Sequence, residues 1–159
     1  MKTFTDNAGR TWTVAMTLDA AKRVKDLLGV NLLDIEGGEP PLISRLGTDE
    51  ILLCDVIFAL IQPQAEAQGV SDREWAAALG GEAILAAQEA FYEELIAFFL
   101  LRGRGDRAKA LTEQKRMIVL VIEANEARLD AVDVEAEVRA IFGKPSTSSP
   151  GSSASPPAP

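Results

Sequence analysis

Four carboxylates near the C-terminal end have the clearest spacing for chemistry. Glu123 and Glu126 are three residues apart, and Asp130 and Asp133 repeat this spacing. Pairs of this kind on facing helices hold Mg²⁺ in all-helical nucleotide pyrophosphohydrolases, because the ion prefers several converging oxygen ligands. Here all four lie in one stretch, too close in sequence to come from two facing helices. We therefore expect a solvated face rather than a metal site.

The side chains that serve most other catalytic chemistry are missing. The chain has no histidine, the commonest general base and zinc ligand. Its one cysteine, Cys54, lies in the apolar run 51–61 without a histidine to activate it, so we interpret it as a small core side chain. No glycine-rich loop has phosphate-binding spacing. The sequence therefore predicts no catalytic, cofactor or metal site, and a protein that is not an enzyme.

The overall composition limits the partners. The 159 residues are 47% hydrophobic and 25% charged, which fits one globular domain. The net charge of -8 disfavours nucleic acid and anionic membranes as partners. No apolar run approaches the roughly 20 residues of a membrane span, and the N-terminus lacks a signal-peptide pattern. A cytoplasmic location is expected.

A change of composition marks the end of the folded body. Residues 144–159 contain six Ser, five Pro and one charge, with no large apolar side chain. Such a segment cannot bury enough surface to offset the entropy of ordering it. We predict one helical domain over residues 1–143 and a disordered Ser/Pro-rich tail over residues 144–159.

The chain begins with the pattern of a β-hairpin. Residues 3–5 and 11–17 are rich in Thr, Val and aromatic residues, and a turn containing Asn7 and Gly9 separates them. One face of the hairpin should carry the large apolar side chains. These are Phe4, Trp12, Val14 and Met16.

Capping residues and periodicity predict helices after the hairpin. Thr17 caps the first helix, which Gly29 ends, and Ser71 opens a short third one with a capping box. A second helix is expected from Thr48 to residue 61, with Pro63 near the start of the next element. The predicted fold class is mainly α: a short N-terminal β-hairpin packed on a small helical bundle, with a disordered C-terminal tail.

The predicted helix 82–101 is the most informative element. Its apolar side chains fill an arc of about 160°, whereas packing on one core needs about 100°. Either two neighbours in the same chain cover this arc, or one shoulder remains free for a partner. In the second case, the candidate contacts are Tyr92, Ile96 and Phe99.

The last stretch combines a long helix with uneven charge. Asp106 can cap a helix that reaches residue 142, with a break near residues 129–133, and we assign the β-branched run 117–122 to it. Residues 102–116 have six bases against two acids (+4), and residues 117–143 have six acids against two bases (-4). These halves could pair head to tail between copies, giving self-association. The basic half lacks the aromatics that stack on nucleic-acid bases.

The order of these features resembles the tail assembly chaperones of long-tailed bacteriophages. The likeness covers about residues 1–101 and depends on spacing rather than on a catalytic motif. The residues that carry it are Gly9-Arg10-Thr11-Trp12, Thr17-Leu18, Gly29-Val30-Asn31-Leu32-Leu33, Gly69-Val70-Ser71, Trp75, Leu79-Gly80-Gly81, Ala86-Ala87 and Phe98-Phe99.

The resemblance implies a function in virion assembly. Such chaperones bind the aggregation-prone tape-measure protein in the host cytoplasm and hold it in solution while the tail tube polymerises. The tail 144–159 would then be the linker where a longer, frameshifted product diverges. Two alternatives stay open: a helical protein–protein adaptor or regulatory module, and a Mg²⁺-dependent all-helical nucleotide pyrophosphohydrolase.

Overall fold

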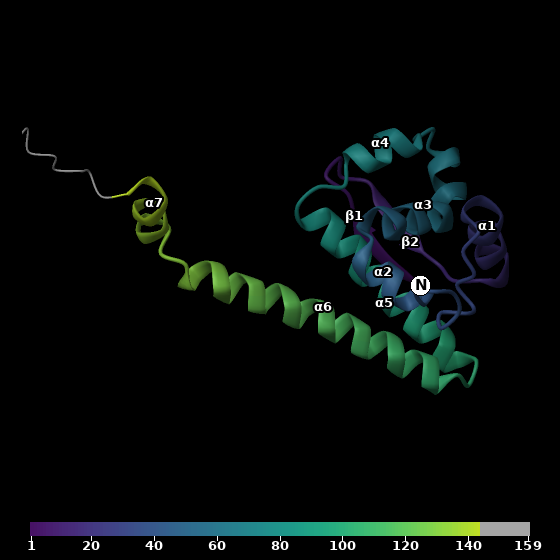
Figure 1. Ribbon diagram of the computed structural model, residues 1–159. Helices are drawn as coiled ribbons and strands as arrows, with labels where there is room; N and C mark the ends of the chain where they lie inside the picture. The colour runs from purple at the N-terminus through teal and green to yellow at the C-terminus, as the bar shows by residue number, and fades with distance from the viewer. Residues whose placement is uncertain (144–159) are drawn as a thin grey trace, which may run out of the picture. The chain divides into compact units, whose positions relative to one another are not determined.

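The structure is a computed structural model that describes residues 1–143 of the chain. It confirms the predicted fold class, mainly α with a short N-terminal hairpin (Figure 1). The predicted disorder of residues 144–159 lies outside the described residues. The elements are β1 (Lys2–Thr5), β2 (Thr11–Val14), α1 (Leu18–Leu28), α2 (Leu42–Thr48), α3 (Glu50–Ala67), α4 (Asp72–Ala77), α5 (Glu82–Leu101), α6 (Gly105–Ala131) and α7 (Val134–Phe142).

The contacts within the chain divide it into two compact units. The first is Met1–Leu120, and the second begins at Val121, within α6. A single domain over residues 1–143 was the expectation from sequence.

The hairpin lies between α3 and α5 in the first unit (Figure 1). Its strands pair antiparallel, with Phe4 opposite Trp12 and Lys2 opposite Val14. The predicted apolar face is buried against the helices, including Met16 just after β2. An isolated two-stranded sheet is marginal in water, so this packing stabilises the hairpin.

The carboxylate of Asp6 organises the turn of the hairpin. It is buried and accepts hydrogen bonds from Trp12 Nε1 at 2.9 Å, from Arg10 Nε at 2.8 Å, and from the backbone N–H groups of Ala8 and Arg10 at 2.9 and 3.0 Å. Burial alone would raise the pKa of Asp6. The bonds from Trp12 and Arg10, with the charge of Arg10, outweigh burial and lower this pKa below its ordinary value of 3.8.

Two polar side chains join the hairpin to the helices on either side. The Gln64 amide of α3 accepts from Thr13 N–H at 2.9 Å and donates to the Thr13 carbonyl at 2.6 Å, as a neighbouring strand would. On the other side, Met16 N–H donates to Glu94 Oε1 of α5 at 2.9 Å. These bonds satisfy groups that burial would otherwise leave unpaired.

Two of the predicted helix boundaries are confirmed by their caps. Thr17 Oγ1 accepts from Ala20 N–H at 3.1 Å at the start of α1, and Gly29 ends that helix with a left-handed φ of 68°. Ser71 and Glu74 form the expected capping box at the start of α4. The apolar faces of both helices contribute to the core, through Val24 and Trp75.

The prediction for the segment around Pro63 was wrong. The helix α3 begins at Glu50 rather than at Thr48, with Asp49 as its cap, and continues through Pro63 to Ala67. A proline inside a helix leaves the carbonyl four residues earlier without its usual N–H partner. Here that carbonyl, on Ala59, accepts from Arg23 Nε at 2.7 Å, so the side chain replaces the missing backbone donor. The short α2 before it was not predicted.

The second unit contains the last turns of α6 and the helix α7. The predicted break is confirmed at Val132 and Asp133, where Asp133 caps α7 by accepting from Ala136 N–H at 3.1 Å. The run 117–122, assigned to helix from sequence, lies within α6. All residues from 121 to 143 are exposed.

Replacing Asp6 should destabilise the fold. In Asp6→Asn the amide brings N–H donors towards Trp12 and Arg10, so we expect unfolding free energy to fall by about 1–3 kcal/mol at neutral pH. Urea unfolding measures this change.

The stability of the fold should also depend on pH through Asp6. Because the folded pKa of Asp6 is lowered, its contribution to the unfolding free energy is present above pH 3.8 and is lost as the pH falls further, through the folded pKa.

The control for this variant is Asp26→Asn, at an exposed position of α1. It should leave the stability of the chain nearly unchanged. Equal effects of the two substitutions would contradict the role assigned to Asp6.

The bond between Arg23 and the Ala59 carbonyl should depend on Pro63. Arg23→Met keeps the aliphatic stem but removes the donor, and should cost about 1–3 kcal/mol of unfolding free energy. In a Pro63→Ala background the restored N–H can pair with Ala59, so the same substitution should cost less. A double-mutant cycle by urea unfolding measures the difference. Additive effects would mean that Arg23 does not compensate for the proline.

Candidate functional site

The helix α5 has the predicted bounds and is covered from several directions. Gly80 and Gly81 precede it, and Gly81 has a φ of 57°, a conformation that favours glycine. The hairpin and α3 bury Phe91 and Leu95. Neighbours in the same chain therefore cover most of the wide apolar arc, as the first of the two sequence alternatives requires.

A tight turn leads the chain from α5 into α6. Gly103 adopts a φ of 72° there, and Arg104 pairs with Asp106 at 2.8 Å. The bonds from Arg104 lower the pKa of Asp106 to about 2. The first part of α6 then packs on the core through Ala108 and Leu111, which are both buried. The turn at Gly103 thus places the first part of α6 beside α5.

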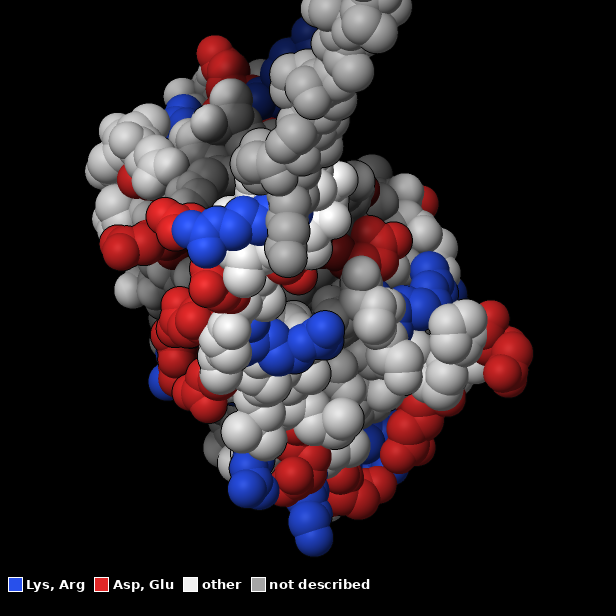
Figure 2. Space-filling model, turned by 60° about the vertical axis from the view of Figure 1, so that its left-hand side comes forward, with Lys and Arg blue, Asp and Glu red and all other residues white. Residues whose placement is uncertain are grey.

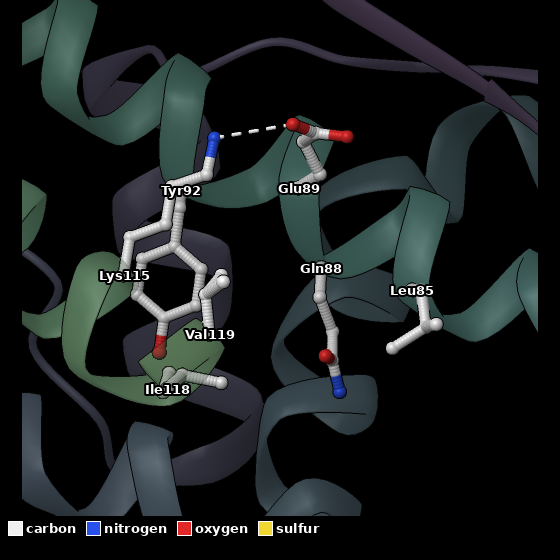
Figure 3. A pocket seen from close by; sticks show the side chains of 7 residues that line it. All are labelled: Leu85, Gln88, Glu89, Tyr92, Lys115, Ile118 and Val119. Atoms are coloured by element: carbon white, nitrogen blue, oxygen red, sulfur yellow. Dashed lines mark hydrogen bonds and ion pairs between the residues drawn. The ribbon is translucent and has the colours of Figure 1, made fainter. Parts of the chain in front are cut away.

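An apolar groove lies between α5 and α6 within the first unit. We call it the α5–α6 groove, and its hollow has a volume of about 190 Å³. Figure 3 shows its side chains, which come from one helix or the other. They are Leu85, Gln88, Glu89 and Tyr92 of α5 and Lys115, Ile118 and Val119 of α6.

Exposed apolar side chains mark the two edges of the groove. Leu85 is 53% exposed on the α5 side, and Val119 is 47% exposed on the α6 side. Ile118 is half-buried and packs against the core below. The hollow is smaller than the 300–1,000 Å³ typical of sites for small molecules. Its size and lining suit one or two apolar side chains of a protein partner.

An ion-pair cluster closes one side of the groove. Lys115 Nζ lies 3.3 Å from Glu89 Oε1 (Figure 3). It also lies 3.6 Å from Glu93 Oε1, and the two pairs join α6 to α5. All three side chains are at least 30% exposed, so solvent screens the pairs and they contribute little stability. Their effect is on position, since they hold Lys115 along the groove.

Tyr92 forms the buried wall of the groove. Its ring is almost fully buried, and its hydroxyl lies towards Ile118 (Figure 3). Within residues 1–143 this hydroxyl has no hydrogen-bond partner. Burial raises the pKa of Tyr92 from 10.0 to about 12, so the phenol is neutral at physiological pH.

The three candidate contacts from sequence lie in different surroundings. Tyr92 lines the groove, whereas Ile96 is half-buried against the core and does not line it. Phe99 is 2% exposed, under the guanidinium of Arg107, whose carbon lies 5.7 Å from the ring centroid. That these three residues bind a partner stays a prediction. Of the three, only Tyr92 is placed to touch one bound in the groove.

Several groove residues were not singled out from sequence. Leu85 was counted only as part of the apolar arc of its helix. The run 117–122 was noted as apolar, and this was the available signal for Ile118 and Val119. What the sequence could not show is that α6 turns back along α5.

The residues noted in the sequence for their chemistry lie at exposed or half-buried positions. Glu123, Glu126, Asp130 and Asp133 are all exposed, and among residues 1–143 no three potential ligands lie together as a metal site requires. Burial, with the charges of nearby carboxylates, raises the pKa of Cys54 to about 11. The thiol is therefore protonated at neutral pH and a poor nucleophile.

Charge is mixed on the visible surface of the molecule. Figure 2 shows acidic and basic side chains interspersed with uncharged ones on that face, without the continuous basic area that a phosphate backbone would require. Among the described residues, no helix has the length and apolar character needed to cross a membrane.

Comparison of this chain with known proteins gives no relative. Neither the family models, the curated proteins nor the solved structures include a match to this chain. The resemblance to tail assembly chaperones therefore stays a prediction from sequence.

The burial of Tyr92 can be measured directly, because it is the only tyrosine in the chain. We expect the ultraviolet absorbance of its phenolate to appear at about pH 12 rather than near pH 10.0. A raised folded pKa also means that its contribution to stability is present below pH 10.0 and is lost as the pH rises through the folded value. A transition near 10.0 in the folded protein would show that water reaches the hydroxyl.

Proposed function

We propose that this protein is a tail assembly chaperone of a bacteriophage or prophage, acting in the host cytoplasm. It binds the tape-measure protein and keeps it in solution while the tail is assembled. The α5–α6 groove holds an apolar segment of that partner, with Tyr92 in its wall. The proposal combines the sequence resemblance with the geometry of the groove.

The observation that carries this proposal is the groove itself. It has an apolar floor and exposed apolar edges at Leu85 and Val119. A helix that lays one face into such a groove would insert side chains spaced three and four residues apart. Each inserted leucine-sized side chain that leaves water adds about 1.5–3 kcal/mol before the costs of ordering and association.

The charge of the chain supports the same function. A net charge of -8 keeps a protein dispersed while it exposes apolar surface. A chaperone that holds a partner in solution needs both properties, because the complex must resist aggregation until the partner is released.

A second candidate function is that of a helical adaptor that associates with itself. The observation in its favour is the set of exposed apolar side chains in the second unit, where the long C-terminal helical region offers large uncovered residues. The most exposed are Leu129, Val134, Ile141 and Phe142.

Light scattering of the wild-type chain and of the Ile141→Asp, Phe142→Asp double variant tests the adaptor function. A self-associating adaptor would be oligomeric, and the double variant would be monomeric.

The magnesium-dependent hydrolase has no supporting observation in the described residues. Its four candidate carboxylates are exposed, without a grouping of ligands around them. Calorimetry of the chain with Mg²⁺ and nucleotides would test this alternative. Measurable heat of nucleotide binding would support the hydrolase.

The proposal predicts that a charge at the edge of the groove abolishes the chaperone effect. The long, helix-rich product encoded next to this gene should be soluble when co-expressed with the wild-type chain and should aggregate with Leu85→Asp. An aspartate there would be buried on binding without a partner, which costs several kcal/mol. The soluble fraction of the co-expressed product measures the effect.

The matched control is Leu18→Asp, because Leu18 is as exposed as Leu85, at 53%, but lies at the start of α1. This variant should keep the partner soluble. Equal loss with both variants, or no such long reading frame beside the gene, would rule out the proposal.

A further inference from the structure

A second apolar depression crosses α3, at residues outside the α5–α6 groove. It consists of two hollows, of about 260 and 320 Å³, that share Asp55 and Asp72 in their linings. We call the pair of hollows the α3 trough. The first is lined by Ile51, Trp75 and Ile84 among others, and the second by Leu27, Leu28 and Phe58.

The floor of the α3 trough is continuous and aromatic. Phe58 in one hollow contacts Trp75 in the other, with ring centroids 5.3 Å apart. Exposed apolar side chains lie in the lining of each hollow, Ile51 at 76% and Leu27 at 55%. Trp75 is itself 1% exposed, and its Nε1 has no hydrogen-bond partner within residues 1–143. The two hollows therefore form one surface.

Negative charge is concentrated where the hollows meet. Asp55 and Asp72 line both of them, and Glu50 lies in the lining of the first. In the described part of the chain none of these three carboxylates forms an ion pair. Burial raises the pKa of Asp55, and the charges of Asp72 and Asp49 raise it further. The junction of the trough thus lacks a neutralising cation.

We propose that the α3 trough binds an amphipathic helix of a partner protein that carries a lysine or arginine in the middle of its apolar face. The cation would lie between Asp55 and Asp72, where it relieves their repulsion. Apolar side chains three or four residues before and after it lie on the same helix face, and they would fill the two hollows.

A second copy of this chain is a poorer match for the α3 trough. Its basic segment is residues 102–116, and four of the six cations there already have partners. Arg104 pairs with Asp106, and Arg107 donates to the Leu33 carbonyl. Lys115 pairs with Glu89, and Arg116 pairs with Glu113. The occupant we infer is therefore a different protein. This inference does not depend on the proposed function, which concerns the other groove.

The test uses a synthetic alanine-rich helical peptide with a central lysine and leucines three and four residues to either side. Binding to the full chain is followed by amide chemical shifts. We expect the shifts to change along α3 and α4, and added salt to weaken binding. The Asp55→Asn, Asp72→Asn double variant should bind about fivefold more weakly or worse, because it keeps the hollows but loses the charge.

Two controls separate charge from apolar adhesion. Asp130→Asn removes an exposed carboxylate of the second unit and should bind the peptide like the wild type. A peptide with glutamate in place of the central lysine should not bind. If the double variant does not fold, Ile51→Ser, at a position 76% exposed, tests the same surface through loss of apolar contact, and it too should weaken binding.

Several results would overturn the proposal. These are equal affinity for the lysine and glutamate peptides, unchanged affinity of the variants, and shift changes confined to the α5–α6 groove. Absence of binding at millimolar peptide would do the same. A concentration-dependent dimer of the free chain that is lost in the double variant would assign the α3 trough to a second copy instead.

Discussion

Burial of the apolar arc of α5 is the constraint on which the rest of the fold depends. The arc is too wide for one neighbour: the hairpin and α3 pack against it, and α6 covers part of it where the Arg107 guanidinium lies over the Phe99 ring. The chain has to reverse direction at Gly103 so that α6 can cover part of this apolar surface. The α5–α6 groove lies where that cover is incomplete, beside Leu85. Stability and the proposed binding site thus have the same origin.

Buried polar groups determine how these elements are oriented. Apolar packing alone is non-directional, whereas Gln64 of α3 bonds to Thr13 of β2, and Glu94 of α5 bonds to Met16 just after β2. Misplacing the hairpin would leave the half-buried Gln64 and the buried Glu94 without these partners, at a cost of about 1–3 kcal/mol each. The unpaired hydroxyl of Tyr92 is an exception to this pattern, and it lies in the wall of the α5–α6 groove.

Local signals in the sequence were sufficient to predict most helices and strands. They failed where the bounds of a helix depend on a residue far away in sequence. The caps at Thr17 and Ser71 depend on neighbours within three residues, so they could be predicted. The continuation of α3 through Pro63 depends on Arg23, which is far away in sequence. The candidate site was predictable only in part. Tyr92 of α5 and Val119 of α6 line the same groove only because α6 lies beside α5, and the sequence does not show that arrangement.

The central claim is that the α5–α6 groove binds a helical partner, and hydrogen–deuterium exchange of the full chain tests it most directly. The exchange of the chain alone is compared with that of the chain purified in complex with the long product encoded beside its gene. The account predicts slower exchange in the complex at residues 85–92 and 115–119, which line the groove. Slower exchange that is confined to α1, α3 or the residues after 120, with the groove unchanged, would contradict it.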